Sequence, residues 1–172
     1  MLTLSLLRHA KSSWSDPELD DHERPLAKRG IKDAPRIGRF MAAAKLVPDL
    51  VLCSGAVRTR ATLTLVLAEL PHTPAEILYE EDLYLAAPAA MLARLSKVKL
   101  PARHVLMVGH NPGLQALALE LTGEGARKGL AGLAGKFPTG ALAVIDFDLG
   151  SWSALRAASG RLRLFVTPRR LA

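Results

Sequence analysis

The most constraining feature of this sequence is its alternation of short apolar runs with longer segments of helical periodicity. The apolar runs have the length of strands and lie at residues 4–7, 49–53, 77–79 and 104–109. Apolar residues recur at helical spacing between them, in residues 26–45, 56–70 and 87–97. Such alternation predicts an α/β fold whose mostly parallel sheet is covered by helices on both faces.

Local signals predict where several elements begin and end. Pro48 is expected to end the first helix, and Ser54 is a candidate N-cap of the second. Asn111 and Pro112 have the residue types of an N-cap and a first helical position. The glycine-rich residues 123–135 are predicted to be a mobile connection. Residues 141–147 and 162–166 are predicted to be the closing strands.

The length of 172 residues fits one domain spanning residues 1–172. The single cysteine, Cys53, excludes an intrachain disulfide and a zinc site built from cysteines, and we interpret it as a buried, inert thiol. The apolar run near the amino terminus follows no basic residue and is too short for a signal peptide or a membrane span. We therefore expect a cytoplasmic monomer with no membrane partner.

The formal net charge of +7 is carried by the second half of the chain. Residues 1–86 hold 11 Lys and Arg against 12 Asp and Glu, whereas residues 87–172 hold 12 against 4. The basic residues of this half lack the interleaved aromatic residues of a single-strand binding surface. We interpret them as a solvated basic face and expect no nucleic-acid partner.

Polar and cationic residues follow three of the predicted strands. Arg8 and His9 follow the first strand, Ser54 follows the second with Arg58 one turn into the next helix, and His110 follows the fourth. Because parallel strands end at one edge of a sheet, these side chains are expected to converge there. Arginine forks and helix amino termini bind phosphoryl oxygens. A metal site is disfavoured because arginines repel cations and no carboxylate follows at ligand spacing.

Six short motifs in order resemble the histidine phosphatase superfamily, and within it the small SixA-like phosphohistidine phosphatases. They are Leu7-Arg8-His9-Ala10-Lys11-Ser12, Arg24-Pro25-Leu26 with Gly30, Ser54-Gly55-Ala56-Val57-Arg58-Thr59-Arg60, Glu81-Asp82-Leu83-Tyr84, Val108-Gly109-His110-Asn111-Pro112 and Phe137-Pro138-Thr139-Gly140-Ala141. The resemblance spans nearly the whole chain. It implies a phosphoglycerate mutase-like three-layer α/β/α sandwich without a lid insertion.

The resemblance also implies the roles of the site residues. His9 would be the nucleophile that becomes phosphorylated, Arg8 and Arg58 would bind the phosphoryl oxygens, and His110 would stabilise charge in the transition state. The sequence departs from the family pattern at Ala10, where a glycine is usual, and at Gly55, where a proline is usual. The second departure could loosen the turn that presents Arg58.

The residues suit metal-independent phosphoryl transfer with no cofactor. A neutral imidazole attacks phosphorus and positive groups offset the charge of the equatorial oxygens. The other nitrogen of His9 needs an acceptor, and a backbone carbonyl near Gly109 or Ala10 could serve. A general acid could come from Glu81, with Glu80 and Asp82 as further candidates, or these three residues could form only a solvated acidic turn.

Three functions remain open from the sequence. The first is a phosphatase for phosphohistidine in proteins, because an open site without a lid suits a large substrate. The second is a phosphatase for a small phosphate ester or nucleotide. The third is a phosphate-binding module without turnover.

Overall fold

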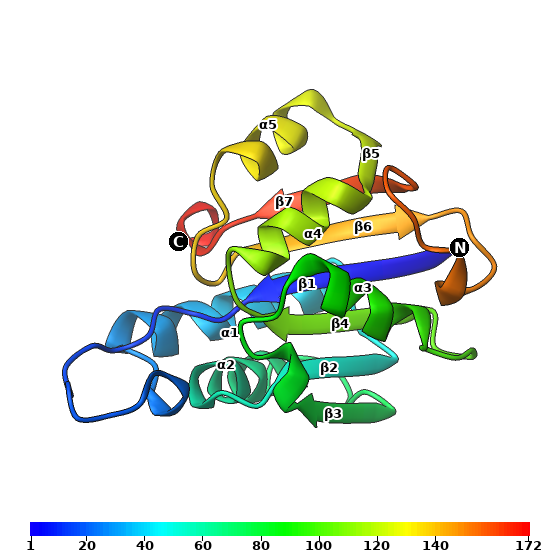
Figure 1. The fold of residues 1–172 in the computed structure, drawn as a ribbon. Coiled ribbons are helices and arrows are strands. Elements are labelled where there is room, and N and C mark those ends of the chain that lie inside the picture. Colours follow the sequence, from blue (N-terminus) through cyan, green and yellow to red (C-terminus); the bar gives the residue numbers. More distant parts are fainter.

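The computed structural model describes residues 1–172 as one seven-stranded sheet with five α-helices (Figure 1). The strands are β1 (Leu2–Arg8), β2 (Leu50–Ser54), β3 (Glu76–Glu80), β4 (His104–Gly109), β5 (Thr122–Gly125), β6 (Leu142–Phe147) and β7 (Gly160–Val166). The helices are α1 (Lys28–Ala43), α2 (Val57–Leu67), α3 (Pro88–Ser96), α4 (Gly113–Leu121) and α5 (Arg127–Gly135). Four short 3-10 helices, η1 (Asp21–Glu23), η2 (Glu81–Leu83), η3 (Trp152–Ala154) and η4 (Pro168–Leu171), complete the structure.

The strand order is β3-β2-β4-β1-β6-β7-β5. Strands β1 to β4 are mutually parallel, β6 is antiparallel to both β1 and β7, and β5 is parallel to β7. The mostly parallel sheet predicted from the sequence is thus confirmed. The carboxyl ends of β1 to β4 lie at one edge of the molecule, and the loop after β1 projects there (Figure 1).

The helices form layers on both faces of the sheet, which makes the fold a three-layer sandwich. One apolar cluster joins the sheet to α1 and α2 through Ile37, Met41 and Leu63, all fully buried. The other joins it to α3, α4 and α5, with Leu95 and Leu117 at its centre. Neighbouring residues on a strand point to opposite faces, so a run of apolar residues such as β1 can supply both clusters.

The prediction of a mobile connection at residues 123–135 is wrong, because this segment contributes to β5 and forms the whole of α5. Helix α5 packs on β7: Leu133 is fully buried, and a Cβ added at Gly132 would lie 3.2 Å from the Phe165 ring. Tertiary packing therefore overrides the low helix propensity of glycine here.

Three predicted helix boundaries also differ from the structure. Ser54 is the last residue of β2, and Ala56 is the N-cap of α2. Helix α4 begins at Gly113 with Pro112 as its N-cap, although Asn111 Oδ1 accepts a hydrogen bond from the backbone N–H of Gln115 at 3.2 Å. Helix α1 ends at Ala43, before Pro48 is reached. No helix is both long and apolar enough to cross a lipid bilayer.

Candidate active site

His9 follows the last residue of β1 and is 5% exposed. Its backbone N–H donates to the carbonyl of Gly109, which ties it to the end of β4. Its side-chain Nδ1 lies 2.7 Å from the carbonyl oxygen of Ala10. A carbonyl can only accept, so Nδ1 carries the proton and Nε2 holds a free lone pair. No protein group bonds Nε2, so the lone pair is available to a ligand.

Arg8 and Arg58 line the same pocket as His9, together with Arg24. Arg8 leaves the end of β1, and its Nη1 donates to the carbonyl of Phe137 at 3.0 Å. Arg58 lies in the first turn of α2 and is 2% exposed. Its Nη1 and Nη2 donate to the backbone carbonyl and the carboxylate of Asp21, at 2.6 and 2.9 Å. Both guanidinium groups are therefore held by the protein before any ligand binds.

His110 follows β4 directly, and its ring centroid lies 5.4 Å from that of His9. Its Nε2 lies 2.8 Å from the hydroxyl oxygen of Ser54, which also accepts from the backbone N–H of Ala56 at 3.3 Å. The hydroxyl proton of Ser54 is thus available to Nε2. In that arrangement His110 Nδ1 is an N–H donor.

Buried polar atoms without a hydrogen-bond partner are concentrated in this pocket. Three of the four such side-chain atoms in the protein are Arg8 Nε, Arg58 Nε and His110 Nδ1. Leaving a buried donor unpaired costs about 1–3 kcal/mol, so donors gathered around one pocket indicate a site for an acceptor. The pocket has a volume of about 320 Å³ and is suited to an oxyanion.

The electrostatics of the pocket keep both histidines neutral. Burial, together with the charges of Arg58 and Arg8, lowers the pKa of His9 to about 4, although the Ala10 hydrogen bond acts in the opposite direction. Burial, followed by the proximity of His9 and Arg58, lowers the pKa of His110 to about 3. At neutral pH His9 is therefore an unprotonated base, and the positive charge of the pocket resides on its arginine and lysine side chains.

Asp21 is the only carboxyl group that lines the pocket, and residue patterns gave no sign of its role. Tyr84 donates from its hydroxyl to the Asp21 carboxylate, and Arg58 and Arg24 donate to it as well. These donors, Tyr84 first, hold the pKa of Asp21 well below its usual range. Asp21 is thus an ionised anchor that holds Arg58 and Arg24 in place. Asp21 lies in a segment with several other acidic residues, so its residue type alone did not distinguish it from its neighbours.

The three acidic residues proposed as general acids lie outside the pocket lining. Glu81 accepts from His22 Nε2 at 2.8 Å and its side chain is 71% exposed. Glu80, the last residue of β3, is paired with Arg94 of α3 at 2.7 Å. Asp82 lines a separate shallow pocket beside α3. None of them reaches the reacting position in this conformation.

The two departures from the family pattern are accommodated without moving a charged group. Ala10 is fully buried, and its backbone N–H donates to Thr62 Oγ1 at 3.0 Å. An ideal Cβ at Gly55 would lie 1.8 Å from Glu81 Oε1, so the glycine makes room for the Glu81 side chain. Arg58 is nevertheless firmly held, because it is bonded to Asp21 rather than positioned by the turn alone.

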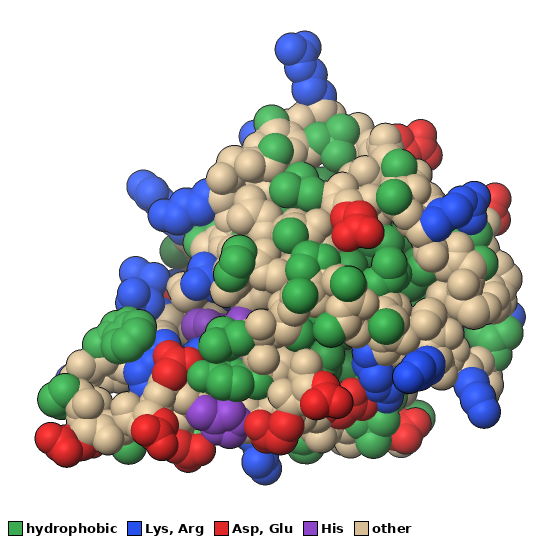
Figure 2. All heavy atoms as spheres, in the orientation of Figure 1, with side chains coloured by type: hydrophobic (Ala, Val, Ile, Leu, Met, Phe, Trp, Pro, Cys, Tyr) green, Lys and Arg blue, Asp and Glu red, His purple; other side chains and the backbone are tan.

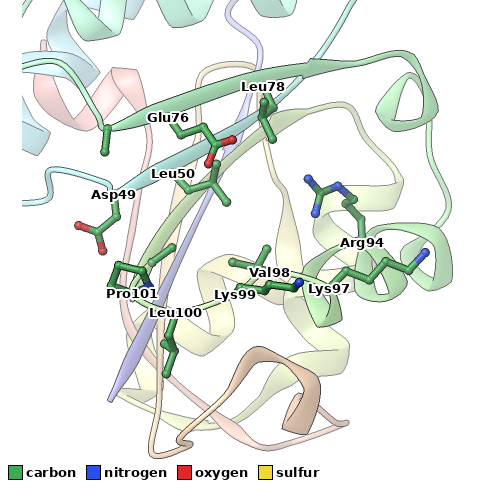
Figure 3. A pocket seen from close by; sticks show the side chains of 12 residues that line it. Asp49, Leu50, Glu76, Leu78, Arg94, Lys97, Val98, Lys99, Leu100 and Pro101 are labelled. Atoms are coloured by element: carbon green, nitrogen blue, oxygen red, sulfur yellow. The ribbon is translucent and has the colours of Figure 1, made fainter.

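A larger pocket of about 490 Å³ lies at the opposite end of the strands, where β2 and β3 begin (Figure 3). Its lining includes Leu50, Val98 and Pro101, with Lys97 and Lys99 at its border and no histidine. It lacks any unpartnered buried polar atom. No group of three or more His, Cys, Asp or Glu residues anywhere in the chain could hold a metal ion. The pocket around His9 is therefore the candidate active site.

Comparison with known proteins places the chain in a family. It is 30% identical to a solved structure assigned as the phosphohistidine phosphatase SixA of Agrobacterium tumefaciens, with a TM-score of 0.81 over 97% of this chain and 98% of that one. A protein with the same assignment from Nakamurella multipartitia is also 30% identical, with a TM-score of 0.80 over 97% and 96% of the two chains. The chain belongs to the histidine phosphatase superfamily. It is a phosphatase of the SixA-like branch.

Further relatives and a further solved structure are similar over nearly the whole length of the chain. An uncharacterized protein of Mycobacterium tuberculosis is 37% identical over 167 residues, which cover 95% of this chain and all of that one. One from Mycobacterium leprae is 35% identical over the same lengths. A SixA structure complexed with tungstate shares the fold at 20% identity, with a TM-score of 0.79 over 99% of this chain and all of that one. No protein-family model matches the chain.

Proposed function

We propose that this histidine phosphatase hydrolyses phosphohistidine in proteins and that His9 carries the phosphoryl group as a covalent intermediate. Arg8 and Arg58 bind the phosphoryl oxygens, and His110 donates from Nδ1 to one of them. The observation that carries the proposal is the free Nε2 of His9, fixed by the Nδ1 hydrogen bond to Ala10 in a pocket that also contains three buried donors without a partner.

The reaction has two displacements at phosphorus. In the first, the lone pair of His9 Nε2 forms a bond to phosphorus while the bond from phosphorus to the substrate nitrogen breaks, and its electrons stay on that nitrogen. In the second, water attacks the phosphorus of the intermediate, loses a proton to solvent and releases inorganic phosphate with a free His9 Nε2. Both steps require neutralisation of the phosphoryl oxygens, which Arg8 and Arg58 supply.

The lack of a general acid in the pocket favours phosphohistidine over an alkyl phosphate ester as the substrate. An alkoxide leaving group needs a proton from a general acid, but Asp21 is ionised and Glu81 points to His22. A phosphoimidazole that carries a proton on its second nitrogen departs as neutral imidazole and needs no acid from the protein. A SixA structure of the same fold that holds tungstate, an oxyanion, is consistent with oxyanion binding in this pocket.

Covalent labelling tests the intermediate. Incubation with a phosphorylated substrate, rapid quenching at alkaline pH and peptide mass spectrometry should locate one phosphate on His9. His9→Ala should abolish both the label and turnover, whereas His72→Ala, which changes an exposed histidine outside the pocket, should affect neither. Full turnover by His9→Ala would refute the mechanism.

A substrate panel tests the substrate class. A phosphohistidine peptide, p-nitrophenyl phosphate, a sugar phosphate and a nucleoside monophosphate are compared by kcat/KM, which measures selection between transition states. We expect the peptide to exceed the small esters by on the order of 100-fold. A sugar phosphate or nucleotide that matches the peptide would instead support the small-ester phosphatase.

A further inference from the structure

We propose that a basic groove beside the active site docks an acidic segment of the substrate protein next to the phosphorylated residue. This inference rests on the proposed protein substrate. The groove has a volume of about 490 Å³ and is lined by the cationic residues Arg29, Lys32, Arg36, Lys136 and Arg169. We call this surface the basic groove.

The basic groove adjoins the catalytic pocket. Thr139 lines both cavities, and Arg29 Nη2 donates to its hydroxyl at 3.5 Å. On its far side the groove shares Lys136, Pro138 and Thr167 with a third cavity of about 360 Å³, which adds Lys128 and Arg170. A continuous cationic track therefore leads away from the pocket that contains His9.

The groove combines helix α1 with the carboxyl-terminal part of the chain. Arg29, Lys32 and Arg36 lie on α1, Lys136 follows α5, and Arg169 lies in η4, which packs against α1. Figure 2 shows Lys and Arg side chains along the edge of the molecule near the C-terminus, beside the hollow in which a histidine is visible. Cationic residues from both halves of the chain are thus gathered on one side of the active site.

The only acidic residue of the groove, Asp33, does not neutralise it. Its buried carboxylate is paired with Arg36 at 3.3 Å and Arg29 at 3.7 Å. Lys32, Lys136 and Arg169 are exposed and form no side-chain hydrogen bond or ion pair. Exposed cationic side chains that are clustered on one surface attract an anionic partner and raise its rate of association.

The form of the groove favours an acidic protein segment over a single bound phosphate. A site for one phosphate has buried, preorganised donors, as the catalytic pocket does, but the groove contains no buried unpartnered polar atom. Its charges are instead exposed and spread along an open surface, which suits several carboxylates of an extended segment. A single-stranded nucleic acid would need stacking platforms, but the basic groove has no aromatic residue. The one aromatic residue of the neighbouring third cavity, Phe165, packs against Phe137 with ring centroids 5.3 Å apart.

The test compares two charge-reversal variants. Lys32→Glu with Arg169→Glu reverses the groove at two exposed positions, whereas Lys97→Glu with Lys99→Glu makes the same change beside the pocket at the other end of the sheet (Figure 3). Neither pair removes a hydrogen bond or an ion pair of the structure. The substrates are two phosphohistidine peptides of equal length, one flanked by glutamates and one by serines, together with p-nitrophenyl phosphate.

For the unaltered protein at low salt, kcat/KM for the glutamate peptide should exceed that for the serine peptide by on the order of 10-fold. This preference should shrink as salt screens the charges. The groove variant should lose the preference and still hydrolyse p-nitrophenyl phosphate normally, and the control variant should keep both. Equal kcat/KM for the two peptides, or equal losses in the two variants, would overturn the proposal.

A binding measurement separates this proposal from the proposed function. A fluorescein-labelled glutamate peptide without phosphate is titrated with each protein, and its polarisation is recorded. If no phosphohistidine peptide is hydrolysed, the proposed substrate is wrong, but binding to the unaltered protein and not to the groove variant still supports the groove. No difference in binding between these two proteins, or equally tight binding of a thymidine oligonucleotide of the same charge, would count against an acidic protein segment.

Discussion

The hydroxyl oxygen of Ser54 lies 2.8 Å from Nε2 of His110, and this contact joins the end of β2 to the end of β4 across the floor of the active site. The Ser54 hydroxyl bonds Nε2 of the neutral His110 ring, and the other ring nitrogen, Nδ1, is buried without a partner. Ser54 thereby determines which nitrogen of His110 can donate to a phosphoryl oxygen. A matched pair occurs elsewhere in the sheet, where Ser5 Oγ lies 2.8 Å from His104 Nε2.

Ser54→Ala should lower kcat by on the order of 10-fold, because His110 loses the contact that fixes its proton on Nδ1. Ser5→Ala removes the same type of contact outside the pocket and is the control. We expect both variants to lose about 1 kcal/mol of unfolding free energy but only Ser54→Ala to lose activity. Steady-state kinetics and urea unfolding of both proteins decide the matter, and equal activities would show that the contact is purely structural.

Arg58→Lys should lower kcat/KM by about 100-fold or more, because a lysine keeps the charge but cannot donate through a planar fork. It should also weaken inhibition by tungstate or inorganic phosphate. The control is Arg60→Lys on the same helix, since Arg60 is exposed and lies over the Tyr79 ring, 4.8 Å from its centroid. Similar activities of the two variants would argue against phosphoryl binding by Arg58.

The unfolding free energy should fall as pH drops from about 6.5 towards 4. Burial lowers the pKa of His9 and His104 to about 4 and that of His110 to about 3, so the unfolded chain takes up protons first in this range. His22 acts in the opposite direction, because Glu23 and Glu81 raise its pKa.

Urea unfolding at pH 7.5 and 5 measures this loss, which should be on the order of 1 kcal/mol per buried histidine. His104→Gln should show a smaller loss between the two pH values than the unaltered protein, because it removes the one histidine of the three that lies outside the active site. A pH dependence unchanged by this substitution would contradict a low pKa for His104.

Gly30→Ala should destabilise the protein by about 2 kcal/mol or more, because the new Cβ would lie 2.2 Å from the backbone oxygen of Lys11. Displacement of Lys11 should also lower kcat, since this residue follows the Ala10 carbonyl that orients His9. Gly135→Ala is the control, as nothing lies within 4 Å of its Cβ position. Thermal unfolding and kinetics should show no loss for Gly135→Ala, and a stable, fully active Gly30→Ala protein would contradict the close packing at Lys11.

The parts of the fold that were predictable are those with a local signal. Hydrophobic periodicity marks β4 and α1 without reference to the rest of the chain, and the parallel order of strands follows from their alternation with helices. Arg8, His9, Arg58 and His110 could be placed at one sheet edge for the same reason. The helix at residues 127–135 was not predicted, because packing against the sheet rather than its own glycine-rich sequence stabilises α5, as the positions of Leu133 and Gly132 show.

The sequence by itself determined six of the seven strands, the presence of helices on both faces of the sheet, and the cationic and imidazole groups at the strand ends. These features depend on short-range patterns and on one rule of parallel topology. Only the tertiary structure decided that Asp21 holds Arg58, that Ser54 contacts His110, and that His9 Nδ1 bonds the Ala10 carbonyl. It also brought α1 and the carboxyl-terminal segment together as the basic groove. Such contacts join residues far apart in the chain, and no local periodicity records them.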